Sequence, residues 1–156
     1  MIRLEIVRSD QRELLWNIHQ KYLYEMTNFY PDEMDAAGNY EYGYFDAYFT
    51  DSRRTALLIY DGDALAGFAM LNPYSYFDRC PDHVMAEFTV FPAFRRRHIA
   101  LDAAREILRR YPGCWEIKYN EQNLPAKTLW NRLAAPYDPE KRALGEGETV
   151  LCFSTK

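Results

Sequence analysis

Residues 84–104 read VMAEFTVFPAFRRRHIALDAA, and they predict a β-strand, a short loop that contains proline, and an α-helix. The strand, 84–91, is apolar apart from Glu87 and Thr89. Three consecutive arginines separate it from the helix, so the strand runs through a basic loop into the helix start. Small or apolar residues then recur at spacings of three and four, which is one face of a packed α-helix: Ala100, Ala103, Ala104, Ile107, Leu108 and Tyr111.

The basic loop consists of Arg95, Arg96 and Arg97. The first amides of a helix have no partner within the helix, and the helix dipole adds partial positive charge there. Guanidinium groups can also make bidentate, charge-assisted bonds to phosphate oxygens. A solvated basic face is the alternative, but positive side chains at this end of a helix oppose the dipole. The loop therefore favours an anion, above all a phosphate, bound mainly by the amides of residues 96–99.

At these residues the sequence resembles the GNAT-type N-acetyltransferase superfamily. The family binds a pyrophosphate on the motif R/Q-x-x-G-x-G/A, which falls here on RRRHIA, residues 95–100. The resemblance continues in PGCWEI, 112–117, and in the spacing N-x-x-A-x-x-x-W of Asn123, Ala126 and Trp130. The combination is similar to a bacterial branch of predicted acetyltransferases and covers about residues 84–133.

The resemblance implies acetyl-CoA as co-substrate, no metal, and transfer of the acetyl group to a primary amine by direct attack in a ternary complex. It implies that the pyrophosphate lies on the motif, and that backbone groups at the strand end pair with the pantetheine arm. A further implied cofactor contact is Asn123, which also reads as the N-cap of a helix. The cofactor-binding residues expected on this basis are Phe88, Thr89, Val90, Arg95, Arg96, Arg97, His98, Ile99, Ala100, Asn123 and Trp130.

Two residues depart from the family pattern. His98 stands where a glycine would allow close approach of phosphate and an unusual φ. A histidine with an ordinary helical backbone would still leave its amide available, whereas a restricted pocket would bind weakly. Trp130 stands where many relatives have a tyrosine that is proposed to protonate the departing thiolate. Tryptophan cannot supply that proton, so packing against the pantetheine arm or the core is the expected role, and Tyr119 is a weak substitute for the acid.

Glu87 is the candidate catalytic base. It lies in the middle of an apolar strand, on the face expected to hold Met85 and Thr89. A carboxylate there is unfavourable unless it is paired or solvated through a cleft, and burial would raise its pKa towards that of a useful base. An acceptor ammonium with a pKa of ~10.4 must lose a proton before it attacks a thioester. A structural ion pair or buried hydrogen bond is the alternative interpretation.

The segment around Tyr40, Tyr42 and Tyr44 is expected to line the acceptor pocket. In the family, the early helices and loop cover the substrate. Tyrosine walls suit a cationic amine, and nearby acids would add to this, namely Asp35, Glu41 and Asp46. A satellite cluster of aromatic side chains is the alternative.

The composition predicts one domain over residues 1–156, because 48% apolar content supplies an adequate core. The net charge of −4 suits a cationic partner better than nucleic acid. Three widely spaced cysteines without a C-x-x-C predict neither a disulfide framework nor a zinc site, which fits a reducing cytoplasm. No stretch approaches a signal peptide or the ~20 apolar residues of a membrane helix.

Local patterns predict the remaining elements. Alternation over 2–7, 55–60, 64–71, 114–119 and 149–154 predicts strands, with an Asp-Gly hairpin turn at 61–63 and one further short strand within 136–148. Helices are predicted from a capping box of Asp10 and Glu13 to about Thr27, briefly around 45–49, and from Pro125 to Ala135. The fold class is α/β or α+β, a mixed, mostly antiparallel sheet of six to seven strands with helices on both faces, which is also the GNAT fold.

The function expected from the sequence is therefore an acetyl-CoA-dependent N-acetyltransferase with a small-molecule or peptide amine as acceptor. Two alternatives stay open. One is a fold relative that binds CoA or another anion with little or no catalysis, which His98 and Trp130 favour. The other is a nucleic-acid-binding domain that uses Arg95–Arg97, Arg109 and Arg110, against which the acidic net charge counts. Neither nucleic acid nor membrane is the expected partner, and a homodimer is compatible with the resemblance.

Overall fold

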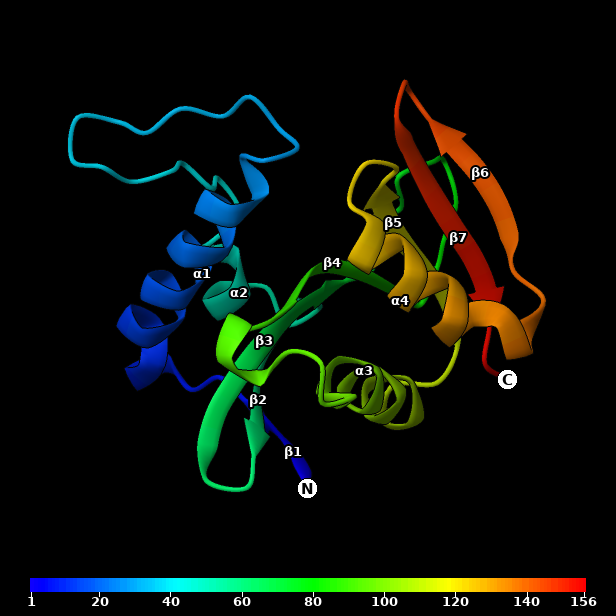
Figure 1. The fold of residues 1–156 in the computed structure, drawn as a ribbon, viewed down its shortest axis with the longest axis horizontal. Helices are drawn as coiled ribbons and strands as arrows, with labels where there is room; N and C mark the ends of the chain where they lie inside the picture. The colour runs from blue at the N-terminus through cyan, green and yellow to red at the C-terminus, as the bar shows by residue number, and fades with distance from the viewer.

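The fold is described from a computed structural model, in which residues 1–156 are all placed (Figure 1). The strands are β1 (Ile2–Ile6), β2 (Thr55–Asp61), β3 (Ala64–Asn72), β4 (His83–Val90), β5 (Cys114–Asn120), β6 (Glu140–Leu144) and β7 (Glu148–Ser154). The α-helices are α1 (Arg12–Met26), α2 (Ala47–Thr50), α3 (Ile99–Arg110) and α4 (Leu124–Ala134). Short 3-10 turns are η1 (Ser9–Gln11), η2 (Pro92–Phe94) and η3 (Ala135–Tyr137). No helix is long and apolar enough to cross a membrane.

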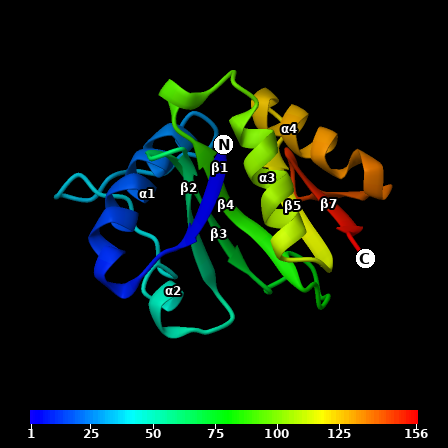
Figure 2. The ribbon, with the colours of Figure 1, turned by 90° about the horizontal axis from the view of Figure 1, so that it is seen from below.

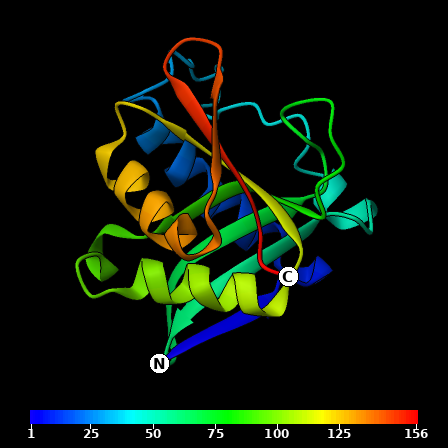
Figure 3. The same cartoon turned by 90° about the vertical axis from the view of Figure 1, so that its right-hand side faces the viewer.

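The strands form one seven-stranded sheet in the order β1-β2-β3-β4-β5-β7-β6. Every neighbouring pair is antiparallel except β4 and β5, which are parallel. The helix α1 covers one face, and α3 and α4 cover the other (Figures 2 and 3). The predicted mixed, mostly antiparallel sheet with helices on both faces is confirmed, including the short strand within 136–148.

Each face of the sheet buries its own core. Under α3 and α4 lies a cluster of 19 buried residues, which includes Ala103, Ala104, Ile107 and Leu108 of the predicted helix face. Under α1 lies a cluster of eight. Burial of a side chain such as Leu or Ile contributes about 1.5–3 kcal/mol. The periodicity of three and four in α3 is therefore the reason why this helix lies flat on the sheet and holds the basic loop at its start.

The strands β4 and β5 pair over only three residues each, His83–Met85 with Trp115–Ile117. Beyond Met85 the two strands separate, so one edge of β4 has no neighbouring strand from Ala86 onwards. In Figure 1 this separation lies in the middle of the sheet, between α1 and α4. The interruption of the sheet creates a place in its interior where a ligand could pair with strand backbone.

A β-bulge in β4 lies at the same point. Met70 pairs with Glu87 and Leu71 with Met85, so Ala86 has no partner on β3. The expectation that Met85 and Glu87 share a face is wrong, because the extra residue changes the alternation. Met85 packs in the core under α3 and α4, whereas Glu87 lies opposite Met70, a residue of the core under α1.

The start of α1 also differs from the prediction. The expected capping box of Asp10 and Glu13 does not form. Instead, the amide of Arg8 donates to Oε1 of Gln11 over 2.9 Å, and the carboxylate of Asp10 accepts from Nε of Arg8. The 3-10 turn η1 therefore precedes the helix, and α1 begins at Arg12.

Candidate functional site

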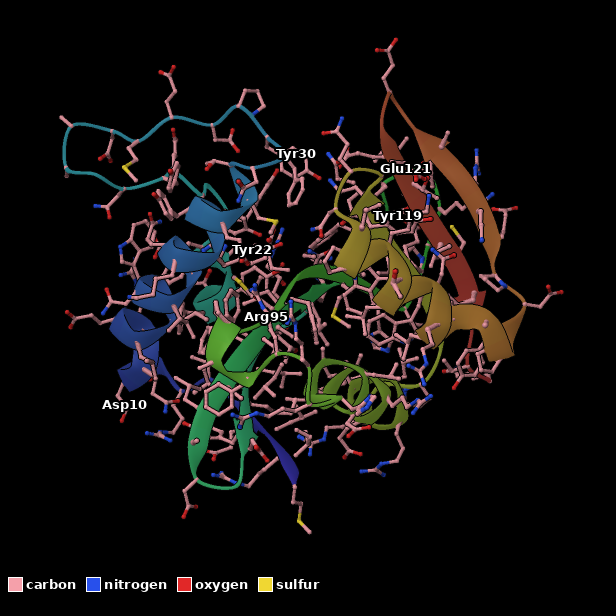
Figure 4. All side chains as sticks on the ribbon, in the orientation of Figure 1. Asp10, Tyr22, Tyr30, Arg95, Tyr119 and Glu121 are labelled. Atoms are coloured by element: carbon pink, nitrogen blue, oxygen red, sulfur yellow. The ribbon has the colours of Figure 1, made fainter.

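The separation of β4 from β5 opens into a cleft of about 630 Å³. The helix α1 and the segment that follows it form one wall, and β5 and α4 form the other. Figure 4 shows Tyr22 and Tyr119 on these two opposite walls, with Tyr30 between the end of α1 and β5. Residues of β4 form the floor: Met85, Ala86, Glu87 and Phe88.

The carboxylate of Glu87 lies at the floor of this cleft and pairs with no cation. Burial raises its pKa from 4.5 to about 7, against the smaller lowering effects of the Tyr22 and Tyr42 hydroxyls and the Lys118 ammonium. A structural ion pair is therefore not formed, whereas the other alternative, a buried hydrogen bond, fits the hydroxyls of Tyr22 and Tyr42 beside the carboxylate. A carboxylate with a pKa near 7 can exchange a proton at neutral pH.

Four tyrosines of the cleft surround this carboxylate. Burial is the main cause that raises the pKa of Tyr22, Tyr30, Tyr42 and Tyr76, and the charge of Glu87 raises each of them further. All four therefore keep their protons at neutral pH and face the ligand as neutral hydroxyl groups and aromatic rings.

Lys118 is the one cationic residue that lines the cleft, and it forms an ion pair. Its Nζ lies 3.1 Å from Oε2 of Glu148, which also accepts a hydrogen bond of 2.6 Å from the hydroxyl of Tyr30. The ammonium lies 5.1 Å from the ring centroid of Tyr76 as well. In contrast, three further carboxylates of the cleft, like Glu87, have no cationic partner: Asp32, Glu33 and Glu41.

The backbone amides of residues 96–101 form a row without hydrogen-bond acceptors in the protein. The first amide of α3 that is paired belongs to Asp102, which donates to the carbonyl of His98. Arg96 and His98 have φ values of 65° and 61°, in the left-handed region. His98 therefore does not have the ordinary helical backbone considered from the sequence. It adopts the conformation that glycine favours, at a cost of about 1–2 kcal/mol, and the row of free amides is preserved.

Arg95 does not point to this row. Its Nη1 and Nη2 make a bidentate pair with the carboxylate of Glu25 on α1, over 2.8 and 2.6 Å. Its Nε donates to the carbonyl of Val90 over 2.8 Å. The guanidinium of Arg95, which was expected to bind a phosphate, thus binds α1 and the end of β4 instead. The side chains of Arg96 and Arg97 are exposed and make no ion pair.

Of the other residues expected to bind the cofactor, some line the cleft and some do not. Phe88 and Trp130 line the cleft and meet edge to face, with ring centroids 5.0 Å apart. Asn123 lines it too, and its side chain accepts from the amide of Ala126 as the N-cap of α4. Thr89 and Val90 lie outside the cleft lining, and Ile99 and Ala100 belong to a small cluster at the start of α3.

The aromatic segment divides into two groups. Tyr40 and Tyr42 line the cleft, but Tyr44 does not, because its side chain is 63% exposed and lies against the guanidinium of Arg54. Of the three acids considered with them, only Glu41 lines the cleft. Asp35 accepts from amides of its own loop, and Asp46 pairs with Arg12. Alternation along the chain could not separate these groups, because the segment is mostly a loop.

Sequence reasoning missed several residues of the cleft. Tyr22 falls on the apolar stripe of α1, where a core position was the natural interpretation. Tyr76 lies on the loop between β3 and β4, and its sequence gives no sign of its position. Lys118 is the polar residue that alternates with buried ones in β5, which is a signal that could have been used.

His19 is buried behind the cleft and was also missed. It is 0% exposed, and neither ring nitrogen has a hydrogen-bond partner. Burial lowers its pKa to about 4, so the ring is neutral at physiological pH. The ring of Tyr42 lies edge to face with it at a centroid distance of 4.3 Å. His19 thus acts as an aromatic support for Tyr42 beside Glu87.

Comparison with protein families finds one match. Residues 13–134 match the model of the acetyltransferase (GNAT) family, which spans the cleft, the basic loop and α4. Comparison with curated proteins finds no match.

Solved structures with the same fold are numerous. An acetyltransferase from Thermus thermophilus has a TM-score of 0.67 and 14% identity, over 98% of this chain and 95% of that one. A GNAT-family acetyltransferase from Bacillus cereus has a TM-score of 0.64 and 16% identity, over 100% and 97%. A spermidine N-acetyltransferase from Vibrio cholerae, in complex with CoA and spermine, has a TM-score of 0.64 and 12% identity, over 97% and 92%.

Proposed function

From the premise that the chain belongs to the acetyltransferase (GNAT) family, we propose that it transfers an acetyl group from acetyl-CoA to a primary amine by direct attack in a ternary complex. The observation that carries the proposal is the cleft between β4 and β5, with an unpaired carboxylate at its floor. Acetyl-CoA would supply the acetyl group as a thioester. No group of three or more His, Cys, Asp or Glu side chains is arranged to hold a metal ion.

The residues around the basic loop fit a pyrophosphate. The free amides of residues 96–101 point to an anion, and the helix dipole of α3 adds partial positive charge. Side chains of Arg96 and Arg97 are free to add full charges. The edge of β4 beyond Met85 has no strand partner and can pair with amide groups of a pantetheine arm, as an added strand would. Arg95 then acts by holding α1 to this edge through Glu25.

The residues on the other side of the cleft suit a cationic acceptor. Tyrosine rings and the unpaired carboxylates of Asp32, Glu33 and Glu41 face it. Such groups attract ammonium ions by charge and by cation–π contact. Glu87, directly or through a water, takes a proton from the ammonium and leaves a nucleophilic amine. Free amides on the edge of β4 can stabilise the oxyanion that develops on the carbonyl.

The test has two stages. Thermal unfolding is measured with and without acetyl-CoA at 100 times its Kd, which should add about 2.7 kcal/mol to the free energy of unfolding. Transfer is then measured as release of the CoA thiol with three acceptors: propane-1,3-diamine, spermidine and a lysine-containing peptide. Glu87→Gln should keep the thermal shift and lower kcat by about 10²-fold or more. In the unsubstituted protein, kcat/KM should rise with pH through about 7, as Glu87 loses its proton.

A second candidate function is a module that binds CoA or another anion without catalysis. The replacement of a glycine by His98 and the absence of a tyrosine at Trp130 favour it. A thermal shift without transfer to any of the three acceptors would support this alternative. Absence of a shift in a folded protein would contradict both functions.

A further inference from the structure

Lys118 is a primary amine that the chain itself places in the cleft. Of the lysines in the sequence, only Lys118 lines the cleft. It follows directly after Ile117, the last residue of β5 that pairs with β4. Its side chain is 28% exposed, so a ligand in the cleft can reach its ammonium group. The amine therefore lies at the point where the two strands separate and where the thioester of acetyl-CoA would be bound.

Lys118 and Glu87 project from the same face of the sheet. Side chains alternate along a strand, and Ile117 and Tyr119 of β5 pack in the core under α3 and α4. Lys118 therefore projects towards α1, as Glu87 does from β4 on the other side of the separation. Burial raises the pKa of Glu87, and the ammonium of Lys118 is close enough to lower it in part. An amine and the proposed base thus face the same space.

The ammonium of Lys118 is held by groups that would also suit a foreign amine. Its Nζ lies 3.1 Å from Oε2 of Glu148, and 5.1 and 5.9 Å from the ring centroids of Tyr76 and Tyr30. A carboxylate and two aromatic rings are the usual surroundings of a bound ammonium ion. The flexible lysine stem allows Nζ to turn from Glu148 towards the space between β4 and β5. Lys118 can therefore take the place of an acceptor.

We propose that Lys118 is itself an acetyl acceptor, which the protein modifies in its own cleft when acetyl-CoA is bound and no amine substrate is present; the inference rests on the proposed acetyl transfer. Glu87 takes one proton from the ammonium, directly or through a water, and the lone pair of Nζ forms a bond to the acetyl carbon. The C–S bond breaks, and its electron pair stays on sulfur. The sulfur takes the proton that the nitrogen loses as the amide forms. The products are Nε-acetyl-lysine and the CoA thiol, and the proton on Glu87 leaves to solvent.

Acetylation changes the charge of the cleft. It removes the one cation of the lining, because an acetylated lysine is neutral. Glu148 then has no ion-pair partner, and its charge adds to those of the unpaired carboxylates on the acceptor side. A cationic acceptor should bind more tightly to the modified protein, since the local potential is more negative.

The test requires no knowledge of the natural acceptor. The protein is incubated with acetyl-CoA alone, and the acetylation of each lysine is followed over time by mass spectrometry of its peptides. Lys118 should be modified about 10²-fold faster than Lys127. Lys127 is the internal control, because it also pairs with a glutamate, Glu121, but lies outside the cleft and has a more exposed side chain, at 45%. Glu87→Gln should lower the rate at Lys118 by about 10²-fold and leave the rate at Lys127 unchanged.

The order of the reaction shows where it takes place. The rate constant at Lys118 should not depend on protein concentration, because amine and cofactor lie in one cleft. A rate constant that rises in proportion to protein concentration would assign the reaction to a second copy and overturn the proposal. Equal rates at Lys118 and Lys127 would show chemical acetylation by free thioester and would also overturn it.

Failure of the inference differs from failure of the proposed function. A protein that acetylates one of the three acceptors named above but leaves Lys118 unmodified would overturn the inference and keep the transfer. A protein that shows the thermal shift with acetyl-CoA but modifies neither an acceptor nor Lys118 would overturn both.

Two variants test the effect on the acceptor. Lys118→Gln has the neutral amide of an acetylated lysine, whereas Lys118→Arg keeps the positive charge and cannot be acetylated. The KM for spermidine should be several-fold lower in Lys118→Gln than in Lys118→Arg. Equal KM values would overturn the effect of the modification on acceptor binding.

Discussion

The raised pKa of Glu87 lowers the free energy of unfolding at neutral pH. In the folded chain its pKa is about 7, compared with 4.5 for a free side chain, and burial is the main cause. Between pH 4.5 and about 7, Glu87 is therefore mostly protonated in the folded state and mostly ionised in the unfolded state. Stability from this group is complete below pH 4.5 and is lost as the pH rises through 7.

Glu87→Gln should remove this pH dependence, because glutamine is neutral at every pH and has nearly the same shape. At pH 8 the variant should be more stable than the wild type by about 3 kcal/mol, since the pKa rises from 4.5 to about 7 and one pKa unit corresponds to ~1.4 kcal/mol. At pH 4 the two free energies of unfolding should agree. Urea denaturation at a series of pH values measures the difference. A constant difference between pH 4 and pH 8 would show that Glu87 is not buried as described.

His98 shows a different relation between residue and backbone. The sequence indicated a doubtful replacement of glycine, but the left-handed φ of 61° is adopted by histidine itself. The free amides of residues 96–101 depend on this turn. The residue type therefore changes the conformational energy of the loop, not its geometry.

At the scale of elements, the loop between β3 and β4 is held by one buried carboxylate. Glu116 on β5 is 2% exposed and accepts from the hydroxyl of Ser75 over 2.5 Å and from the amide of Tyr76 over 2.8 Å. Tyr76 in turn lines the cleft near Glu87. A buried residue of β5 thus positions a residue that lines the cleft.

Glu116→Ala should leave the amide of Tyr76 and the hydroxyl of Ser75 without an acceptor. Hydrogen bonds to a buried charge contribute about 1.5–3 kcal/mol each, so the variant should unfold at clearly lower urea. The KM for the amine should rise, because Tyr76 is no longer fixed, whereas the Kd of acetyl-CoA should change little.

The matched control is Glu140→Ala, which removes an exposed ion pair between the same loop and β6, from Arg79 to Glu140. Exposed pairs are screened by water and salt, so this variant should leave KM unchanged. A similar rise of KM in both variants would mean that any tether of the loop has the same effect and that Glu116 has no particular role.

The elements themselves could be predicted from the sequence, because their signals are local. The helix face of α3, the Asp-Gly hairpin and the alternation of β7 depend on neighbours within a few residues, and the structure contains all three. The candidate site could be predicted only in part. Glu87 was identified as a carboxylate within an apolar strand, and Tyr40 and Tyr42 as residues that would line a pocket; all three line the cleft.

What could not be predicted depends on distant contacts. The bulge at Ala86 exists only in the register between β3 and β4, so the sequence alone placed Met85 on the wrong face. The direction of Arg95 depends on Glu25, 70 positions away along the chain. Periodicity carries no information on either contact, and both decide the geometry of the site.

At the scale of the whole molecule, the sheet consists of two parts that are joined by a short parallel pairing. Strands β1–β4 form one part and β5–β7 the other, and only His83–Met85 and Trp115–Ile117 connect them along the ladder. On the open side of the cleft, the hydrogen bond of Tyr30 to Glu148 links the end of α1 to β7. A ligand between β4 and β5 would contact both parts of the sheet. Any movement of the two parts around the ligand would therefore also act on the segment after α1, which the bond between Tyr30 and Glu148 holds to β7.

The segment 31–39, here called the cover because its first part contributes Asp32 and Glu33 to the lining of the cleft, lies between two tethers. Tyr30 holds one end through Glu148, and the backbone of Tyr40 holds the other through two hydrogen bonds with the amide group of Gln20, of 2.7 and 2.8 Å. Between them the cover is held mainly by bonds of Asp35 within the loop. Loss of the Tyr30 tether should therefore loosen this segment at its start, because residues 31–34 make no backbone hydrogen bond of their own and the Gln20 tether holds only the far end.

Tyr30→Phe should remove the tether at the start of the cover and keep the pair of Lys118 with Glu148. Hydrogen exchange followed by mass spectrometry should show several-fold faster uptake in residues 31–39, and the KM for a cationic amine should rise, because Asp32 and Glu33 lie on this cover. Tyr74→Phe is the control, since it loses an equally short bond of 2.6 Å to Asp51 within one part of the sheet. If both variants exchange like the wild type in residues 31–39, the cover is held by its own loop structure. The bond between Tyr30 and Glu148 would then have no part in ordering the acceptor side of the cleft.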